Sequence, residues 1–139
     1  PLCVPDGPID ASDPEAAEEL VPAVPVIHSG TGVSGAGIER ALNAGVGGIV
    51  VEGTGLGNAT GAIGDAVAEA VPRVPVVVAG RPAGPTEPVY GTPGGAVTLA
   101  EHGVVFADDL PAAKARVGLA LGLAADVPRE SLGELFVRP

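Results

Sequence analysis

Short apolar runs alternate along the chain with longer amphipathic segments. The runs consist mainly of Val, Ile and Ala without polar alternation, which is typical of strands covered on both faces. The segments between them repeat their apolar positions at helical spacing. We expect strands at 24–28, 49–51, 74–78 and 104–106, and helices at 36–43, 60–70, 97–102 and 110–123. This alternation predicts an α/β domain with a four-stranded parallel sheet, doubly wound into three layers.

The helical segments also predict which side chains pack inward, in a flavodoxin- or Rossmann-like arrangement. The first is expected to bury Ile38, Ala41 and Leu42, and to end at Gly45. In the last, a shared apolar face is expected to pack on the sheet while the charged side chains point outward. The tail 131–136 resembles a final amphipathic turn or two. The residues concerned are Ile63, Val67, Ala70 and Val71 in the second helix, Ala113, Val117, Ala120 and Leu121 in the last, and Leu132, Leu135 and Phe136 in the tail.

The first 22 residues differ from the rest. Residues 1–21 contain four prolines, six acidic residues and no basic residue. This composition predicts a linker or arm, with at most a helical turn at 14–20. Residues 23–139 are then the α/β domain.

Charge and cysteine content narrow the possible functions. The formal net charge of −10 disfavours nucleic acid and anionic membranes as partners. An acidic chain whose only lysine is Lys114 favours adaptation to high salt over a coding bias. With Cys3 as the only cysteine, no internal disulfide or thiolate metal site is expected. No apolar run reaches the length of a membrane helix and no secretory signal is visible, so we expect a cytoplasmic protein.

The segment 47–58 is the centre of the expected site. Its buried strand runs into a turn punctuated by glycines, which permit positive φ and close approach of the backbone. Asn58 follows, where its side chain can cap the next helix. Open α/β sheets place ligand sites at such carboxyl ends of strands. The loop 80–95, which carries Tyr90, is long enough to be functional.

A second glycine turn matches the dinucleotide fingerprint. Gly30, Gly32 and Gly35 follow a predicted strand and open a helix, and Glu52 at the end of the next strand could bind a ribose. The alternative is that both turns are only tight connections. Four strands amount to one nucleotide-binding half and leave little of the chain for a catalytic domain, so dinucleotide binding stays an alternative.

An ordered set of motifs over 24–136 resembles the C-terminal domain of the bacterial-type L-asparaginases, and is most similar to the halophilic archaeal branch. The motifs are GIVVEGTGLGN at 48–58, VVV at 76–78 running into Arg81 and AG at 83–84, TEPVYGTPGG at 86–95 ending near EHG at 101–103, and DLPAAKARV at 109–117.

The resemblance implies a cofactor-free, two-domain amidohydrolase that converts L-asparagine to L-aspartate and ammonia. Its N-terminal domain would carry the threonine nucleophile and a threonine–aspartate–lysine triad. Neither is present here: Thr31 and Thr54 lack that context, and His28 and His102 form no triad spacing. We therefore expect no catalytic residue in this chain and no turnover by it alone.

The resemblance also implies a homodimer or tetramer in which this domain contributes to a partner's active site. Asn58 occupies the position of the asparagine that points toward that site, with Gly57 beside it. Some family members carry a substrate-binding glutamate where Ala96 stands, and Glu87 or Tyr90 could compensate. Besides the dinucleotide half-domain, a noncatalytic dimerisation module is the other rival.

Overall fold

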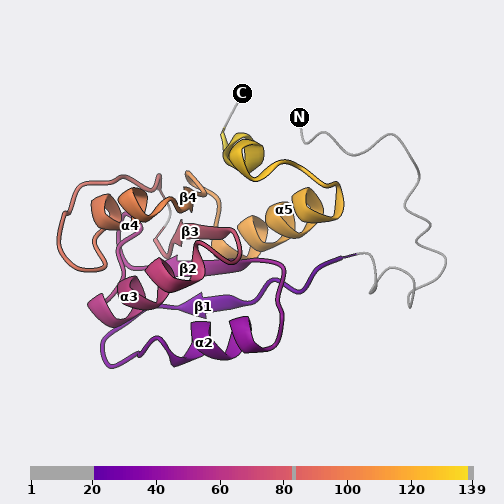
Figure 1. Ribbon diagram of the computed structural model, residues 1–139. Helices are drawn as coiled ribbons and strands as arrows, with labels where there is room; N and C mark the ends of the chain where they lie inside the picture. The colour runs from indigo at the N-terminus through magenta and orange to yellow at the C-terminus, as the bar shows by residue number, and fades with distance from the viewer. Residues whose placement is uncertain (1–20, 83, 138–139) are drawn as a thin grey trace.

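Four parallel strands lie in the sheet in the order in which they occur in the sequence, β1-β2-β3-β4. This arrangement is seen in a computed structural model that describes residues 21–82 and 84–137 (Figure 1). The parallel four-stranded sheet predicted from the sequence is thereby confirmed. The strands are shorter or shifted by a few residues from the expected ranges: β1 is Val26–His28, β2 is Ile49–Gly53, β3 is Val76–Gly80 and β4 is Val105–Phe106.

The helices lie in two layers, one on each face of the sheet. Because crossovers between parallel strands are right-handed, a sheet whose order follows the sequence carries its crossover helices on one face. The first layer is α2 (Ala36–Asn43), α3 (Gly61–Ala70) and α4 (Ala96–His102), and the second is α5 (Ala112–Ala124) with the 3₁₀ helix η1 (Arg129–Phe136). The three crossover helices pack on one face of the sheet, and α5 and η1 pack on the other. In Figure 1 the strands lie between α5 and the helices α2 and α3.

The alternation of side chains along the strands divides the apolar core into two clusters. In β2, Ile49 and Val51 face α2, α3 and α4, whereas Val50 faces α5 and η1. Strand β3 repeats this division with Val76 and Val78 on one side and Val77 and Ala79 on the other. Both faces of the strands are therefore covered, which explains the absence of polar alternation in their sequence.

Several predicted details are confirmed. In α2, Ile38, Ala41 and Leu42 are buried, and Gly45 after its end has a φ of 73°. In η1, Leu132 and Phe136 are almost fully buried, and this segment packs against α5 and β4. Arg129 of η1 donates hydrogen bonds to the carbonyl oxygens of Val71 and Val74, so the last segment is tied to the connection between α3 and β3.

The predicted inward face of the last helix is confirmed at Ala120, which is buried, but wrong at Ala113 and Val117. Val117 is 53% exposed and Ala113 is also exposed, whereas the buried positions are Ala112, Ala115, Leu119, Ala120 and Gly122. Almost every residue of α5 is apolar or small, so its sequence carries no periodic signal that could identify the buried face. Arg116 is exposed as expected, but its Nε donates to the carbonyl oxygen of Val24 at 2.9 Å.

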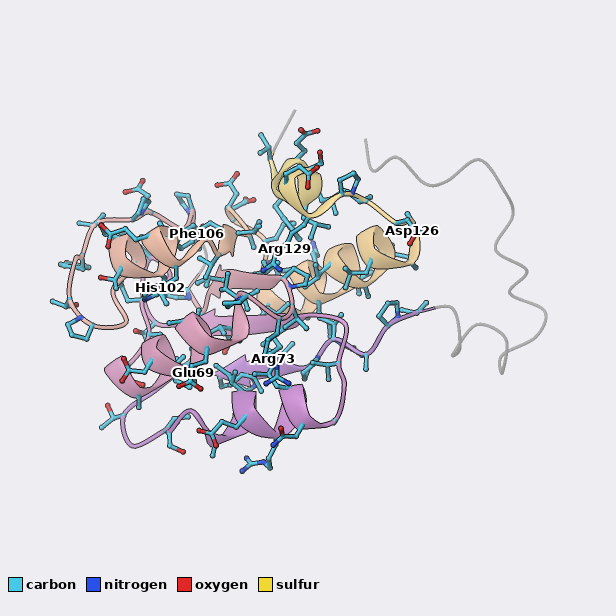
Figure 2. The ribbon with its side chains drawn as sticks, viewed as in Figure 1. Glu69, Arg73, His102, Phe106, Asp126 and Arg129 are labelled. Carbon is cyan, nitrogen blue, oxygen red and sulfur yellow. The ribbon has the colours of Figure 1, made fainter. Side chains whose placement is uncertain are left out.

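The expected arm lies almost entirely outside the described residues, as do the helical turn at 14–20 and Cys3. Within residues 21–82 and 84–137, no helix is long and apolar enough to cross a membrane. Figure 2 draws the side chains of the described part, among them Glu69 near the end of α3 and Arg73 shortly after it, which are both exposed.

Candidate functional site

The carboxyl ends of β1, β2 and β3 bring polar residues from distant parts of the sequence to one edge of the sheet. The strand register pairs His28 with Glu52 and Gly53 with Gly80. Ser29 follows β1 directly, and Arg81 follows β3 directly. The sequence therefore places charged side chains where parallel sheets of this kind hold their ligand sites.

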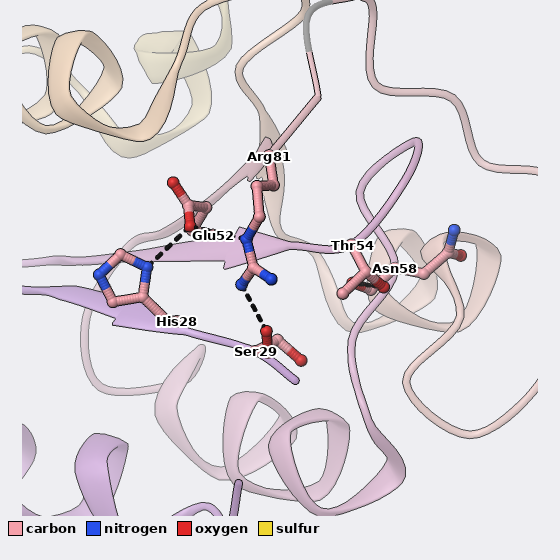
Figure 3. Close-up of polar contacts among 6 residues, drawn as sticks. All are labelled: His28, Ser29, Glu52, Thr54, Asn58 and Arg81. Carbon is pink, nitrogen blue, oxygen red and sulfur yellow. Dashed lines mark hydrogen bonds and ion pairs between the residues drawn. The ribbon is translucent and has the colours of Figure 1, made fainter. Parts of the chain in front are cut away.

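Three of these side chains form a charged cluster (Figure 3). The Oε2 atom of Glu52 lies 2.7 Å from Nδ1 of His28 and accepts a hydrogen bond from Nε of Arg81 at 3.1 Å. The Glu52 side chain is 21% exposed, whereas His28 and Arg81 are 65% and 48% exposed. The carboxylate is thus the inner member of the cluster, and the two basic groups cover it from the solvent side.

The hydrogen bond from His28 holds the pKa of the Glu52 carboxyl below its usual range. Partial burial opposes this effect, and Arg81 adds to the lowering through its own hydrogen bond and its charge. Glu52 therefore stays ionised at neutral pH, and it is a fixed acceptor for both neighbours.

Ser29 connects this cluster to the helix layer. It is 1% exposed, and three of its polar groups make hydrogen bonds. Its N–H donates to the carbonyl oxygen of Glu52 at 2.9 Å, and its own carbonyl oxygen accepts from Nη2 of Arg81 at 2.6 Å. Its Oγ accepts from the backbone N–H of Thr60 at 3.0 Å. A buried serine is acceptable here because its polar groups are satisfied.

The turn after β2 projects from the same edge. Thr54 and Asn58 pair as an isolated bridge, with the N–H of Thr54 donating to the Asn58 carbonyl oxygen at 2.7 Å. Gly55 and Gly57 have φ values of 53° and 100°. A Cβ on Gly53 would lie 2.6 Å from the Asn58 carbonyl oxygen. The three glycines are therefore required by positive φ at two positions and by close approach at the third.

Asn58 does not cap the helix that follows it, so that prediction is wrong. The N-cap of α3 is Thr60, whose side chain accepts from the Ile63 N–H. The Oδ1 atom of Asn58 instead accepts from the backbone N–H of Ala96, the first residue of α4, at 3.0 Å. Because the backbone N–H is a donor, this contact fixes which end of the amide points inward. The amide oxygen is used within the domain, and the NH₂ group keeps its two donors.

The other predicted site residues lie close to this contact. The carbonyl oxygen of Tyr90 accepts from the N–H of Val97, so Tyr90 and Asn58 hold two consecutive amides at the start of α4. The Tyr90 side chain is 56% exposed. A Cβ on Gly57 would lie 3.2 Å from Cγ2 of Thr86 in the loop between β3 and α4. The structure thus brings Gly57, Asn58 and the backbone of Tyr90 together.

The residues of the dinucleotide fingerprint are less well placed for a cofactor. A Cβ on Gly35 would lie 2.6 Å from Cβ of Ala66, so this glycine is required for packing of α2 against α3. Gly32 has a φ of 79°, and nothing lies within 4 Å of a Cβ placed on it. A Cβ on Gly30 would make an ordinary contact with Cγ2 of Val33 at 3.9 Å. The Glu52 carboxylate, which would have to bind the ribose, already accepts from His28 and Arg81.

The described residues contain no group of three or more His, Cys, Asp or Glu side chains that could hold a metal ion. His102 lies in the last turn of α4, as expected, and is exposed. Sequence reasoning missed Ser29, Thr60 and the role of Arg81. A serine directly after a strand was the available signal for the first, whereas no local pattern indicates a contact between residues 29 and 81.

Comparison with protein families identifies one match. The family model of the glutaminase/asparaginase C-terminal domain matches residues 23–136, which include all the strands and helices described above. A search of the curated proteins found no match.

Proposed function

This chain belongs to the glutaminase/asparaginase C-terminal domain family, and we propose that it completes the active site of an L-asparaginase. Membership of a C-terminal domain family implies an N-terminal partner domain. In the proposed enzyme that domain supplies the threonine nucleophiles, and the reaction converts L-asparagine to L-aspartate and ammonia without a cofactor. The chain alone has no turnover. The assembled enzyme is a homodimer or tetramer in the cytoplasm, and it belongs to the halophilic archaeal branch.

The amide orientation of Asn58 is the observation that carries this proposal. Its Oδ1 is held by the Ala96 N–H, so the group that it can offer to a partner is the NH₂ donor pair. A fixed neutral donor is suited to a substrate carboxylate or to the oxygen of a threonine hydroxyl, because it orients the acceptor without adding charge. Both acceptors are expected in an asparaginase site.

The position of Asn58 supports the same role. The turn projects at the carboxyl edge of the sheet, and it is held by backbone contacts to the loop 80–95: Ala59 N–H donates to Gly94 O at 2.7 Å, and Glu87 N–H donates to Leu56 O at 2.9 Å. A residue on such a braced turn keeps its direction when a partner surface approaches, as a site for positioning requires.

The test is ammonia release from L-asparagine in about molar salt, with the N-terminal domain supplied in trans. We expect activity only when both halves are present.

Asn58→Ala and Asn58→Asp separate the two roles of the side chain, which accepts a hydrogen bond through its oxygen and can donate through its NH₂ group. Aspartate can still accept from the Ala96 N–H but donates nothing, so both variants should lose rate while only Asn58→Ala loses stability. Full activity of Asn58→Asp contradicts a donor role, and ammonia release by the 139-residue chain alone contradicts the division of labour.

The two rival functions have their own tests. Calorimetry with NAD at about millimolar concentration examines the dinucleotide half-domain, which would produce binding heat that Glu52→Gln weakens. A noncatalytic dimerisation module would associate with the N-terminal domain and restore no activity.

A further inference from the structure

The turn that carries Asn58 is held at both ends by one residue outside it, Arg81. The backbone N–H of Arg81 donates to the carbonyl oxygen of Gly53, directly before the turn, at 3.1 Å. The side chain reaches the other end indirectly, because its Nη2 donates to Ser29 O and Ser29 Oγ accepts from Thr60 N–H. Thr60 lies two residues beyond Asn58.

The Glu52 carboxylate fixes the direction of the guanidinium group. It accepts from Nε of Arg81 at 3.1 Å, while Ser29 O accepts from Nη2 at 2.6 Å (Figure 3). The donors of a guanidinium have fixed relative directions, so two acceptors on different nitrogens define the plane of the group. A lysine at this position has one nitrogen and cannot reproduce that geometry. His28, on the far side of Glu52, holds the same carboxylate oxygen at 2.7 Å.

The turn is held by contacts outside it as well as by its own hydrogen bonds. Its internal hydrogen bonds join only Thr54 with Gly57 and Asn58. Its glycines at 55 and 57 have a large unfolded-state freedom that must be lost. A small displacement of a positioning group, of about 1 Å, can reduce the rate of an enzyme by about 100-fold.

We infer that Arg81 is a positioning residue for Asn58, with its side chain acting through Ser29 and Thr60 at one end of the turn. Its contact to Gly53 at the other end is made by the backbone, which the substitutions below leave in place. The effect of Arg81 on the reaction rate rests on the proposed function, whereas its effect on the structure of the turn does not. Arg81 touches neither substrate nor reacting atoms in this role.

The first experiment uses the 139-residue chain and needs no enzyme activity. Amide hydrogen exchange is measured for the chain and for Arg81→Gln, Arg81→Lys and Arg40→Gln, the last changing an exposed arginine of α2. We expect the exchange rates of the Thr60 and Ala96 amides to rise by about tenfold or more in both Arg81 variants and to stay unchanged in Arg40→Gln. Unchanged rates in Arg81→Lys overturn the inference. Should Arg81→Gln fail to fold, Arg81→Lys, which keeps the charge, decides alone.

The second experiment asks whether Arg81 acts through Asn58. In the enzyme assembled with the N-terminal domain, Arg81→Lys should lower kcat by about tenfold or more, with a smaller change in KM. In an Asn58→Ala background, the same substitution should lower kcat no further, although its effect on thermal unfolding persists. A further loss of kcat of the same size in that background overturns the inference, because Arg81 would then act by another route.

The two proposals fail in different ways. If Asn58→Ala leaves kcat unchanged while Arg81→Lys still accelerates exchange at Thr60 and Ala96, the proposed function is wrong and the control of the turn by Arg81 stands. If exchange is unaffected while Asn58→Ala lowers kcat, the proposed function stands and the inference about Arg81 is wrong.

Discussion

The hydroxyl oxygen of Ser29 accepts a hydrogen bond from the backbone N–H of Thr60, across 31 positions of the sequence. This contact joins the end of β1 to the N-terminus of α3. It satisfies a backbone donor that the helix itself leaves unpaired, because the first N–H groups of a helix have no intrahelical acceptor.

Replacing Ser29 by alanine should therefore destabilise the chain. The Thr60 N–H loses its partner at a part-buried position, which should cost about 1–2 kcal/mol of the free energy of unfolding. Urea denaturation measures this. The matched control is Ser34→Ala, since Ser34 makes only a long, exposed contact of 3.4 Å to Ala36 N–H. Equal losses in the two variants would contradict the role given to Ser29.

Gly53→Ala should displace the turn that carries Asn58. The added Cβ would lie 2.6 Å from the Asn58 carbonyl oxygen and 2.9 Å from the Gly57 carbonyl carbon, so backbone atoms must move. We expect a loss of about 2 kcal/mol or more in thermal or chemical unfolding. Gly91→Ala is the control, because nothing lies near a Cβ at that position, and it should change stability by less than about 0.5 kcal/mol. A stability of Gly53→Ala equal to that of Gly91→Ala would show that the turn tolerates the Cβ.

Glu52→Gln should change how stability depends on acid pH. A carboxyl whose folded pKa is lowered stabilises the fold above its unfolded pKa, and this contribution disappears as the pH falls through the folded pKa. The difference between the chain and Glu52→Gln should thus be largest at neutral pH and shrink below about pH 4. Because the cluster is partly exposed, we expect a difference of at most about 1 kcal/mol. Unfolding followed from pH 7 to 3 measures it, with Glu69→Gln on the exposed side of α3 as control. Parallel curves for the two variants would contradict the prediction.

The corrected face of α5 can be tested with substitutions at two positions that lie two residues apart and so face opposite sides of the helix. Leu119→Ala should cost about 2–4 kcal/mol, because this side chain is fully buried against the sheet. Val117→Ala should cost less than about 0.5 kcal/mol, because that side chain is mostly exposed. Denaturant titration compares them, and the reverse order would restore the face expected from the sequence.

Much of the fold could be predicted from the sequence because the signals were local. Continuous apolar runs identified buried strands, and the spacing of Ile38, Ala41 and Leu42 identified the buried face of α2. The same reasoning found Ala120 of α5 but misplaced Ala113 and Val117, because alanine, glycine and leucine occupy nearly every position of that helix. Its orientation follows from packing against the sheet and the tail. A Cβ on Gly118, for example, would lie 3.2 Å from Cε1 of Phe136.

The candidate site was predicted less completely, for a physical reason. The glycine turn and Asn58 were recognised as a unit, but the capping role was assigned to the nearest helix in sequence. The amide oxygen of Asn58 in fact accepts from the N–H of Ala96 at the start of α4, 38 positions away. The cap of α3 is Thr60, whose hydroxyl accepts from the Ile63 N–H. Contacts of this kind depend on the register of the strands and the path of the loop 80–95, which no local pattern specifies.

The sequential order of the strands has a consequence for biosynthesis. A ribosome delivers β1 to β4 together with the three helices that cover one face, and that half of the core can assemble as it emerges. The opposite face, with Val50, Val77 and Ala79, stays open to water until α5 and η1 have been made. Chaperone binding and aggregation of nascent chains should therefore concentrate on this late-covered face, and they should end once Leu132 and Phe136 leave the exit tunnel.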